Sequence, residues 1–113
     1  MRKIINFTKT TIALMTLSSF LTGCGMSDSE RAAYDSCIRS GAYVDAYDKN
    51  RNHLPSTKLG KQIIEDVCYT KVQLYSEGYR IEKIVTIEDF SIYLDHKINE
   101  RSLKSIYLTR IRN

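Results

Sequence analysis

Residues 56–78 decide the fold, and they read STKLGKQIIEDVCYTKVQLYSEG. Apolar residues recur in this stretch at the spacing of one helix face. The face consists of Ile63, Ile64, Val67, Cys68, Val72 and Tyr75. Ser56 or Thr57 is placed to cap the start of a helix, and Gly78 is placed to end it. The stretch therefore predicts an amphipathic helix with one buried face.

A second helix is expected upstream. Ser27 and Glu30 have the spacing of a capping box. From there a helix is predicted over about residues 28–48, followed by a polar loop over residues 49–56 that holds the single proline. The apolar face of this helix is expected to hold Ala33, Tyr34, Cys37, Ile38, Gly41, Val44 and Tyr47.

Two cysteines connect these helices. Cys37 and Cys68 are equally far from the middle of the predicted loop, and each falls on an apolar face. Residues equidistant from the turn of an antiparallel helical hairpin lie opposite each other. The spacing therefore predicts a Cys37–Cys68 disulfide that staples the hairpin, and the alternative is two separate buried thiols.

The C-terminal third is less regular. Residues 80–85 fit either a helical turn or a short strand. Thr86 is a plausible cap for a helix whose core face is expected to hold Ile87, Phe90, Leu94 and Ile98. A break near residues 99–102 leads to a last helix from Ser102, although residues 103–112 also fit a strand. The fold class expected is all-α, a small bundle of three to four helices built on the disulfide-stapled hairpin.

The N-terminus has the pattern of a targeting signal. Residues 1–9 carry Arg2, Lys3 and Lys9 and no acid, and residues 10–21 carry no charge. As a helix this uncharged run would span about 18 Å, against roughly 30 Å for a bilayer core. A secretory signal peptide is therefore predicted rather than a transmembrane helix.

Leu21, Thr22, Gly23 and Cys24 end this run, and together they resemble the lipobox of bacterial lipoproteins. The resemblance implies cleavage after Gly23 and a diacylglyceryl group on the Cys24 thiol, so residues 1–23 are a cleaved signal and residues 24–113 one anchored domain. Gly25, rather than an acidic residue, follows the cysteine, which by the same resemblance favours the outer membrane. The alternatives are ordinary secretion with Cys24 as a spare thiol, or no cleavage.

Charge gives no case for nucleic acid. The formal net charge is +4, but residues 1–23 hold three of the 17 basic residues and none of the 13 acidic ones. The remaining domain is therefore nearly neutral. A local basic excess near the C-terminus includes Arg110 and Arg112, which favours an anionic lipid or an acidic partner, or is simply a solvated helix face.

No catalytic constellation is present in the sequence. His53 and His96 stand apart and have no metal-ligand spacing. We therefore expect no enzyme activity, no metal, no cofactor and no small-molecule substrate. Eight tyrosines and no tryptophan suggest another role. Tyr43 and Tyr47 are predicted to form an exposed, partner-binding ridge on the first helix, and the alternative is a tyrosine-rich boundary layer around a small core.

These observations predict a non-enzymatic envelope lipoprotein that binds another envelope protein at the membrane surface. Only Gly25 and Met26 separate Cys24 from the Ser27 cap, so the domain is expected close to the lipid head groups. In plan, though in no residue motif, the chain is similar to secretion pilotins. The alternatives are a phage- or plasmid-type exclusion or immunity lipoprotein, and a structural or stress lipoprotein of the envelope without a specific partner.

Overall fold

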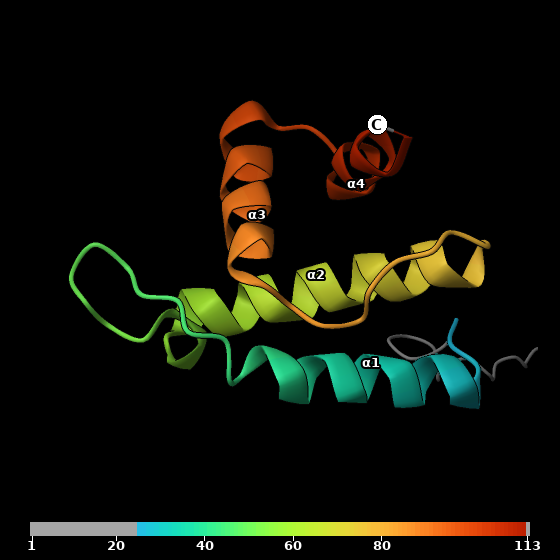
Figure 1. The fold of residues 1–113 in the computed structure, drawn as a ribbon, viewed down its shortest axis with the longest axis horizontal. Coiled ribbons are helices and arrows are strands. Elements are labelled where there is room, and N and C mark those ends of the chain that lie inside the picture. The colour runs from blue at the N-terminus through green and yellow to red at the C-terminus, as the bar shows by residue number, and fades with distance from the viewer. Residues whose placement is uncertain (1–24, 113) are drawn as a thin grey trace, which may run out of the picture. The chain divides into compact units, whose positions relative to one another are not determined.

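The computed structural model describes residues 25–112, so the predicted signal and Cys24 lie outside the described residues. The elements are α1 (Asp28–Gly41), the short 3-10 helix η3 (Leu54–Ser56), α2 (Lys58–Ser76), α3 (Ile87–Asn99) and α4 (Leu103–Arg112) (Figure 1). No strand occurs among these residues. The all-α prediction is confirmed, and the strand alternative for residues 103–112 is wrong.

The chain divides into two units, residues 1–31 and 32–113. In the first, the predicted capping box is present: the Ser27 hydroxyl accepts the Glu30 N–H, and the Glu30 carboxylate accepts the Ser27 N–H.

α1 ends at Gly41 and not near residue 48. The reason is close packing followed by a turn. A Cβ on Gly41 would lie 2.7 Å from Cγ2 of Ile64, so the end of α1 lies directly against α2. Beyond it, the amides of Tyr43 and Val44 bond to carbonyls only three residues back, which ends the α-helical pattern. The connection to η3 is therefore an irregular loop over residues 42–53.

The disulfide prediction is confirmed. Cys37 and Cys68 are bonded, their Cα atoms are 5.8 Å apart, and both side chains are fully buried. α1 and α2 run in opposite directions in Figure 1. The hairpin therefore holds although its loop is longer than predicted, because the two cysteines still fall on the facing sides of their helices.

α2 is bounded by local signals. Thr57, rather than Ser56, is the N-cap, and its hydroxyl accepts the Gly60 N–H at 2.9 Å. Gly60 is required at this position because a Cβ there would lie 1.7 Å from the Leu54 carbonyl oxygen. At the other end Gly78 has φ of +100°, and the Tyr79 N–H bonds to the Leu74 carbonyl, as in a Schellman motif.

α2 is the centre of the core and packs against η3, α3 and α4. Five of the six predicted face residues are buried, namely Ile63, Ile64, Val67, Cys68 and Val72. Tyr75 was wrongly placed, since its side chain is half exposed, and Leu74 and Lys71 are buried instead. The buried face of α2 is thus wider than its apolar stripe.

α3 begins with a capping box between Thr86 and Asp89, and the chain breaks after Asn99 as predicted, where Glu100 takes a left-handed conformation. The core face predicted for α3 is wrong except at Phe90. Ile87, Leu94 and Ile98 are exposed, while the residues that face the core are Asp89, Phe90, Ile92 and Tyr93. Between α2 and α3, residues 79–86 form neither the helical turn nor a paired strand.

Candidate functional site

The predicted partner-binding tyrosines lie in the loop after α1, so the helical ridge expected for them does not exist. Tyr43 is 86% exposed and Tyr47 is 60% exposed. Their loop is well braced. Tyr47 and His53 form an isolated antiparallel bridge, and the Asp48 carboxylate accepts the backbone amides of Asn50 and Asn52. The two tyrosines are therefore displayed by an ordered loop.

Arg110 and Arg112 lie on α4, and Figure 1 places this helix at the opposite end of the fold from the loop over residues 42–53. Arg112 is exposed, whereas the Arg110 guanidinium pairs with the Glu88 carboxylate of α3. The structure therefore does not bring the four predicted partner-binding residues together. The ion pair of Arg110 links two helices.

The two histidines have structural partners. His53 Nε2 bonds to the Val44 carbonyl at 2.9 Å, and its Nδ1 lies 2.8 Å from the Ser56 hydroxyl. His96 Nδ1 bonds to the Arg101 carbonyl. Within residues 25–112 no group of three or more His, Cys, Asp or Glu residues is arranged to hold a metal ion.

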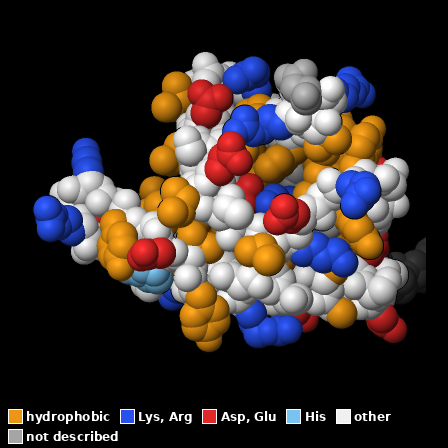
Figure 2. Space-filling view, viewed as in Figure 1, with side chains coloured by type: hydrophobic (Ala, Val, Ile, Leu, Met, Phe, Trp, Pro, Cys, Tyr) orange, Lys and Arg blue, Asp and Glu red, His pale blue; other side chains and the backbone are white. Residues whose placement is uncertain are grey.

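The α3 surface is the first candidate for binding. Ile87, Leu94 and Ile98, with Ser91 between them, recur at the spacing of one helix face. We call this face the outer stripe. Ile87 is 59% exposed, Leu94 is 43% exposed and Ile98 is 79% exposed. Hydrophobic side chains are visible on the surface over α3 in Figure 2. The helix thus presents apolar residues to solvent as well as to the core.

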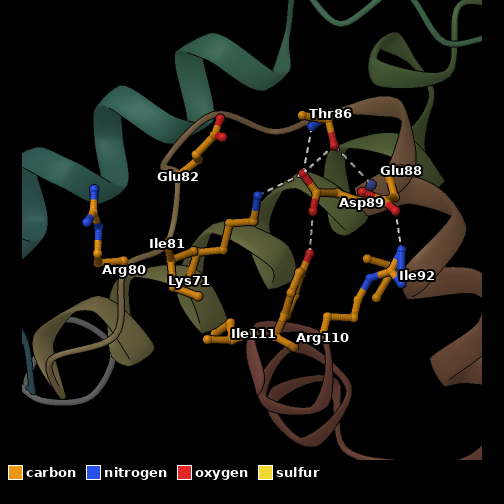
Figure 3. A pocket seen from close by; sticks show the side chains of 11 residues that line it. Lys71, Arg80, Ile81, Glu82, Thr86, Glu88, Asp89, Ile92, Arg110 and Ile111 are labelled. Carbon is orange, nitrogen blue, oxygen red and sulfur yellow. Dashed lines mark hydrogen bonds and ion pairs between the residues drawn. The ribbon is translucent and has the colours of Figure 1, made fainter. Parts of the chain in front are cut away.

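The opposite side of α3 contains a buried polar cluster made of Lys71, Asp89 and Tyr107. The Lys71 ammonium donates to the Asp89 carboxylate at 2.9 Å, and the Tyr107 hydroxyl donates to the other oxygen of that carboxylate at 2.6 Å. Lys71 also donates to the Ile84 carbonyl at 3.0 Å. One carboxylate therefore joins α2, α3 and α4 (Figure 3).

Asp89 has a further role at the start of α3. Its carboxylate accepts the backbone N–H and the hydroxyl of Thr86, at 2.6 Å and 3.0 Å. The single side chain is thus both the capping-box carboxylate and the partner of a buried lysine. The sequence predicted a cap at Thr86 but not the pairing of Asp89 with Lys71, because nothing in the sequence pairs a lysine on one helix with the cap of another.

Burial shifts the titration of two tyrosines. The pKa of Tyr107 is raised well above its usual range by burial and then by the negative charge of Asp89. The pKa of Tyr93 is raised to about 12 by burial and by its hydrogen bond to Asp66, which its hydroxyl donates at 2.9 Å. Both shifts favour the neutral phenol, so both side chains act as hydrogen-bond donors and not as bases.

Beside the polar cluster lies a hollow of about 400 Å³. Its lining combines apolar and charged side chains from residues 80–86, α3 and α4, over Lys71 of α2. Figure 2 shows a hollowed area between α3 and α4, with hydrophobic side chains inside and charged ones around it. In volume the hollow falls within the roughly 300–1,000 Å³ of ligand pockets. It is the second candidate for binding.

None of the described helices has both the length and the apolar character needed to cross a membrane. Comparison with known protein families, curated proteins and solved structures finds no match to this chain.

Proposed function

We propose that this chain is a non-enzymatic envelope lipoprotein, anchored through Cys24, that binds another envelope protein at the membrane surface. The observation that carries the proposal is the outer stripe of α3. Single exposed apolar residues are common on protein surfaces and need no explanation. Three large aliphatic side chains in register on one exposed helix face are typical of a surface that packs against a partner.

The outer stripe is suited to a partner because α3 is held rigidly from behind. Phe90 and Tyr93 pack in the core, and Asp89 ties the helix to α2 and α4. A preorganised helix loses little conformational freedom when a partner binds, which leaves more of the contact energy for affinity. The braced loop with Tyr43 and Tyr47 offers a second contact surface of the kind that interfaces favour.

The sequence supplies the membrane part of the proposal. With only Gly25 and Met26 between Cys24 and the Ser27 cap, the acylated cysteine and the first helix are at most about 10 Å apart along the chain. A domain on so short a tether meets partners in or on the same membrane. Several acyl chains on one residue would make the attachment stable.

Site-specific photocrosslinking in intact cells tests the proposal. A photoreactive phenylalanine analogue is placed at Leu94 in the outer stripe, at Tyr43 in the braced loop, and at the exposed Lys61 of α2 as a matched control. We expect one discrete protein adduct from Leu94, the same adduct from Tyr43 if both surfaces serve one partner, and none from Lys61. No adduct from Leu94, or equal adducts from Leu94 and Lys61, would contradict the proposal.

The anchor is tested separately with Cys24→Ala. Metabolic labelling with an alkynyl fatty acid should label the unsubstituted chain and not this variant, and the variant should leave the membrane fraction. Undiminished label in Cys24→Ala would exclude the lipoprotein reading. Because the photocrosslinking experiment depends on proximity to the partner and this one on acylation, the two parts of the proposal fail independently.

A further inference from the structure

The segment between α2 and α3 has the side-chain pattern of a strand. It runs back along α2 from the end of that helix to the start of α3 (Figure 1). Burial alternates residue by residue: Tyr79, Ile81, Lys83 and Val85 are partly or fully buried, and Arg80, Glu82 and Ile84 are exposed. Up to a bend at Ile84, this period of two is that of a β-strand with one face on the core.

The backbone of this segment, over residues 80–85, has no backbone partner among the described residues. One of its carbonyls, that of Ile84, has a side-chain partner in Lys71. In an extended chain the N–H and C=O of one residue point to the same edge, and alternate residues share that edge. Arg80 and Glu82 line the same hollow as Lys71, so the edge that carries their peptide groups is expected to face it.

That edge adjoins the hollow beside the polar cluster. The walls of the hollow include Ile81 from the segment, Ile92 of α3 and Ile111 of α4, and Lys71 lies beneath them (Figure 3). An extended chain lying along the edge would therefore have an apolar recess for a side chain. Peptide recognition by strand addition has two components, which are unpaired backbone groups that bond the peptide and a recess that takes one of its side chains.

We propose that residues 80–82 are an acceptor edge for an extended peptide of the protein partner, which pairs antiparallel with the backbone of Arg80 and Glu82 and places an apolar side chain in the hollow. The inference rests on the proposed function in taking a protein as the ligand. Opposite charges on facing residues stabilise strand pairs, so the peptide carries an acidic residue opposite Arg80 and a basic residue opposite Glu82.

An isolated peptide strand suits this edge better than a second folded copy. α3 and α4 both contribute walls to the hollow, so an occupant must be thin enough to lie between them and the segment. A second copy would have to bring its own α3 and α4 into the same space. Pairing between copies is the competing occupant, and self-association of the chain alone would reveal it.

The test uses the whole chain and a fluorescent octapeptide that alternates valine with charged residues, with a glutamate and a lysine spaced to face Arg80 and Glu82. Binding is followed by fluorescence anisotropy, and protection of the Arg80 and Glu82 amides by hydrogen exchange. Two N-methylated versions are matched controls. One blocks the N–H groups of the charged residues, which face the edge, and the other blocks those of the valines, which face away.

We expect saturable binding of the peptide. With peptide bound, the amides of Arg80 and Glu82 should exchange more slowly than those of Ile81 and Lys83. Methylating the charged residues of the peptide should lower its affinity at least tenfold. Methylating the valines should change binding less than threefold. The double variant Arg80→Glu and Glu82→Arg exchanges the two charges. It should bind this peptide more weakly, and it should bind a peptide with exchanged charges more tightly. Three outcomes would each overturn the proposal. The two methylation patterns could lower the peptide affinity equally, or no binding could be detected up to about 1 mM peptide. The third is that the amides of Arg80 and Glu82 become protected by self-association of the chain without peptide. None of these outcomes depends on the α3 crosslink.

Discussion

The two halves of this small domain are held together by different chemistry. α1 and α2 are joined by the buried Cys37–Cys68 disulfide within an apolar interface. α3 and α4 are joined to α2 through the buried carboxylate of Asp89 and its partners Lys71 and Tyr107. The first device is covalent and visible in the sequence as spacing. The second depends on three residues whose proximity only the fold creates.

The polar cluster also explains the outer stripe. Successive residues of a helix are rotated by about 100°, so Asp89 lies about 170° around α3 from the midpoint between Ile87 and Ile98. Turning Asp89 toward the buried Lys71 therefore turns the aliphatic residues toward solvent. The face of α3 that meets Lys71 also buries Phe90, Ile92 and Tyr93, so burying this face leaves the outer stripe in solvent.

The largest expected effect comes from removing the shared carboxylate. Asp89→Ala leaves the Lys71 charge buried without its counter-ion and removes the cap of α3, so we expect a loss of about 3–5 kcal/mol in the free energy of unfolding by urea. The control is Asp95→Ala on the same helix, which breaks an exposed ion pair with Arg101 of the following turn and should cost at most about 1 kcal/mol. Equal losses in the two variants would show that the polar cluster does not hold the second half.

Breaking the disulfide should have a slightly smaller effect. Cys37 and Cys68 are 31 positions apart, and in the chain-entropy model a loop of this size contributes roughly 3–4 kcal/mol. We expect Cys37→Ser with Cys68→Ser to lower stability by that amount in urea unfolding. Reductant should destabilise the unsubstituted chain and leave the double variant unchanged. A reductant effect that persists in the double variant would contradict the assignment to this bond.

Local signals in the sequence predict the first half well. The capping box at Ser27, the cap before α2 and the glycine after it are short-range patterns that need no tertiary information. The cysteine pairing was found because both residues lie on strongly apolar faces. The end of α1 was missed because residues 42–47 continue the helical spacing of apolar residues, while the contact between Gly41 and Ile64 that places the turn is tertiary.

The face of α3 that packs on the core was predicted wrongly. The sequence offers two apolar arcs on this helix, one with Ile87 and Ile98 and one with Ile92 and Tyr93, and Phe90 lies between them. The arc with Ile92 and Tyr93 also contains Asp89, and a buried aspartate is unexpected unless its partner is known. The sequence therefore favours the arc with Ile87 and Ile98. Lys71 is that partner, and it lies 18 residues away on another helix. The candidate hollow depends on the same long-range contacts.

A moderate effect is expected from the hydroxyl of Tyr107 alone. Tyr107→Phe removes one hydrogen bond to a buried carboxylate, and we expect a loss of about 1.5–3 kcal/mol at neutral pH. Tyr69→Phe, which changes a half-exposed tyrosine of α2, should cost much less. No difference between these variants would indicate that Asp89 is satisfied without Tyr107.

The pH dependence of stability gives a second test of Tyr107. The pKa of the Tyr107 hydroxyl is well above its usual value in the folded chain and close to 10 in the unfolded chain. Above about pH 10 unfolding therefore releases a proton that the folded state holds. The stabilisation is complete below the unfolded pKa and is lost as the pH rises. Tyr93, with its pKa raised to about 12, acts in the same direction up to that pH. Tyr107→Phe should reduce the fall in stability between pH 10 and 12, by up to about 1.4 kcal/mol per pH unit.

The smallest effect on stability is expected at the outer stripe, and this contrast separates a binding surface from a core. Ile98→Ser changes a side chain that is 79% exposed, so its unfolding free energy should stay within about 0.5 kcal/mol of the unsubstituted chain. Phe90→Ala, on the buried face of the same helix, should cost about 3–5 kcal/mol. If Ile98→Ser keeps full stability yet loses the photocrosslink from Leu94, the aliphatic residues of α3 are there for a partner. A loss of stability comparable to that of Phe90→Ala would instead place Ile98 in the core, and the outward orientation of α3 would be wrong.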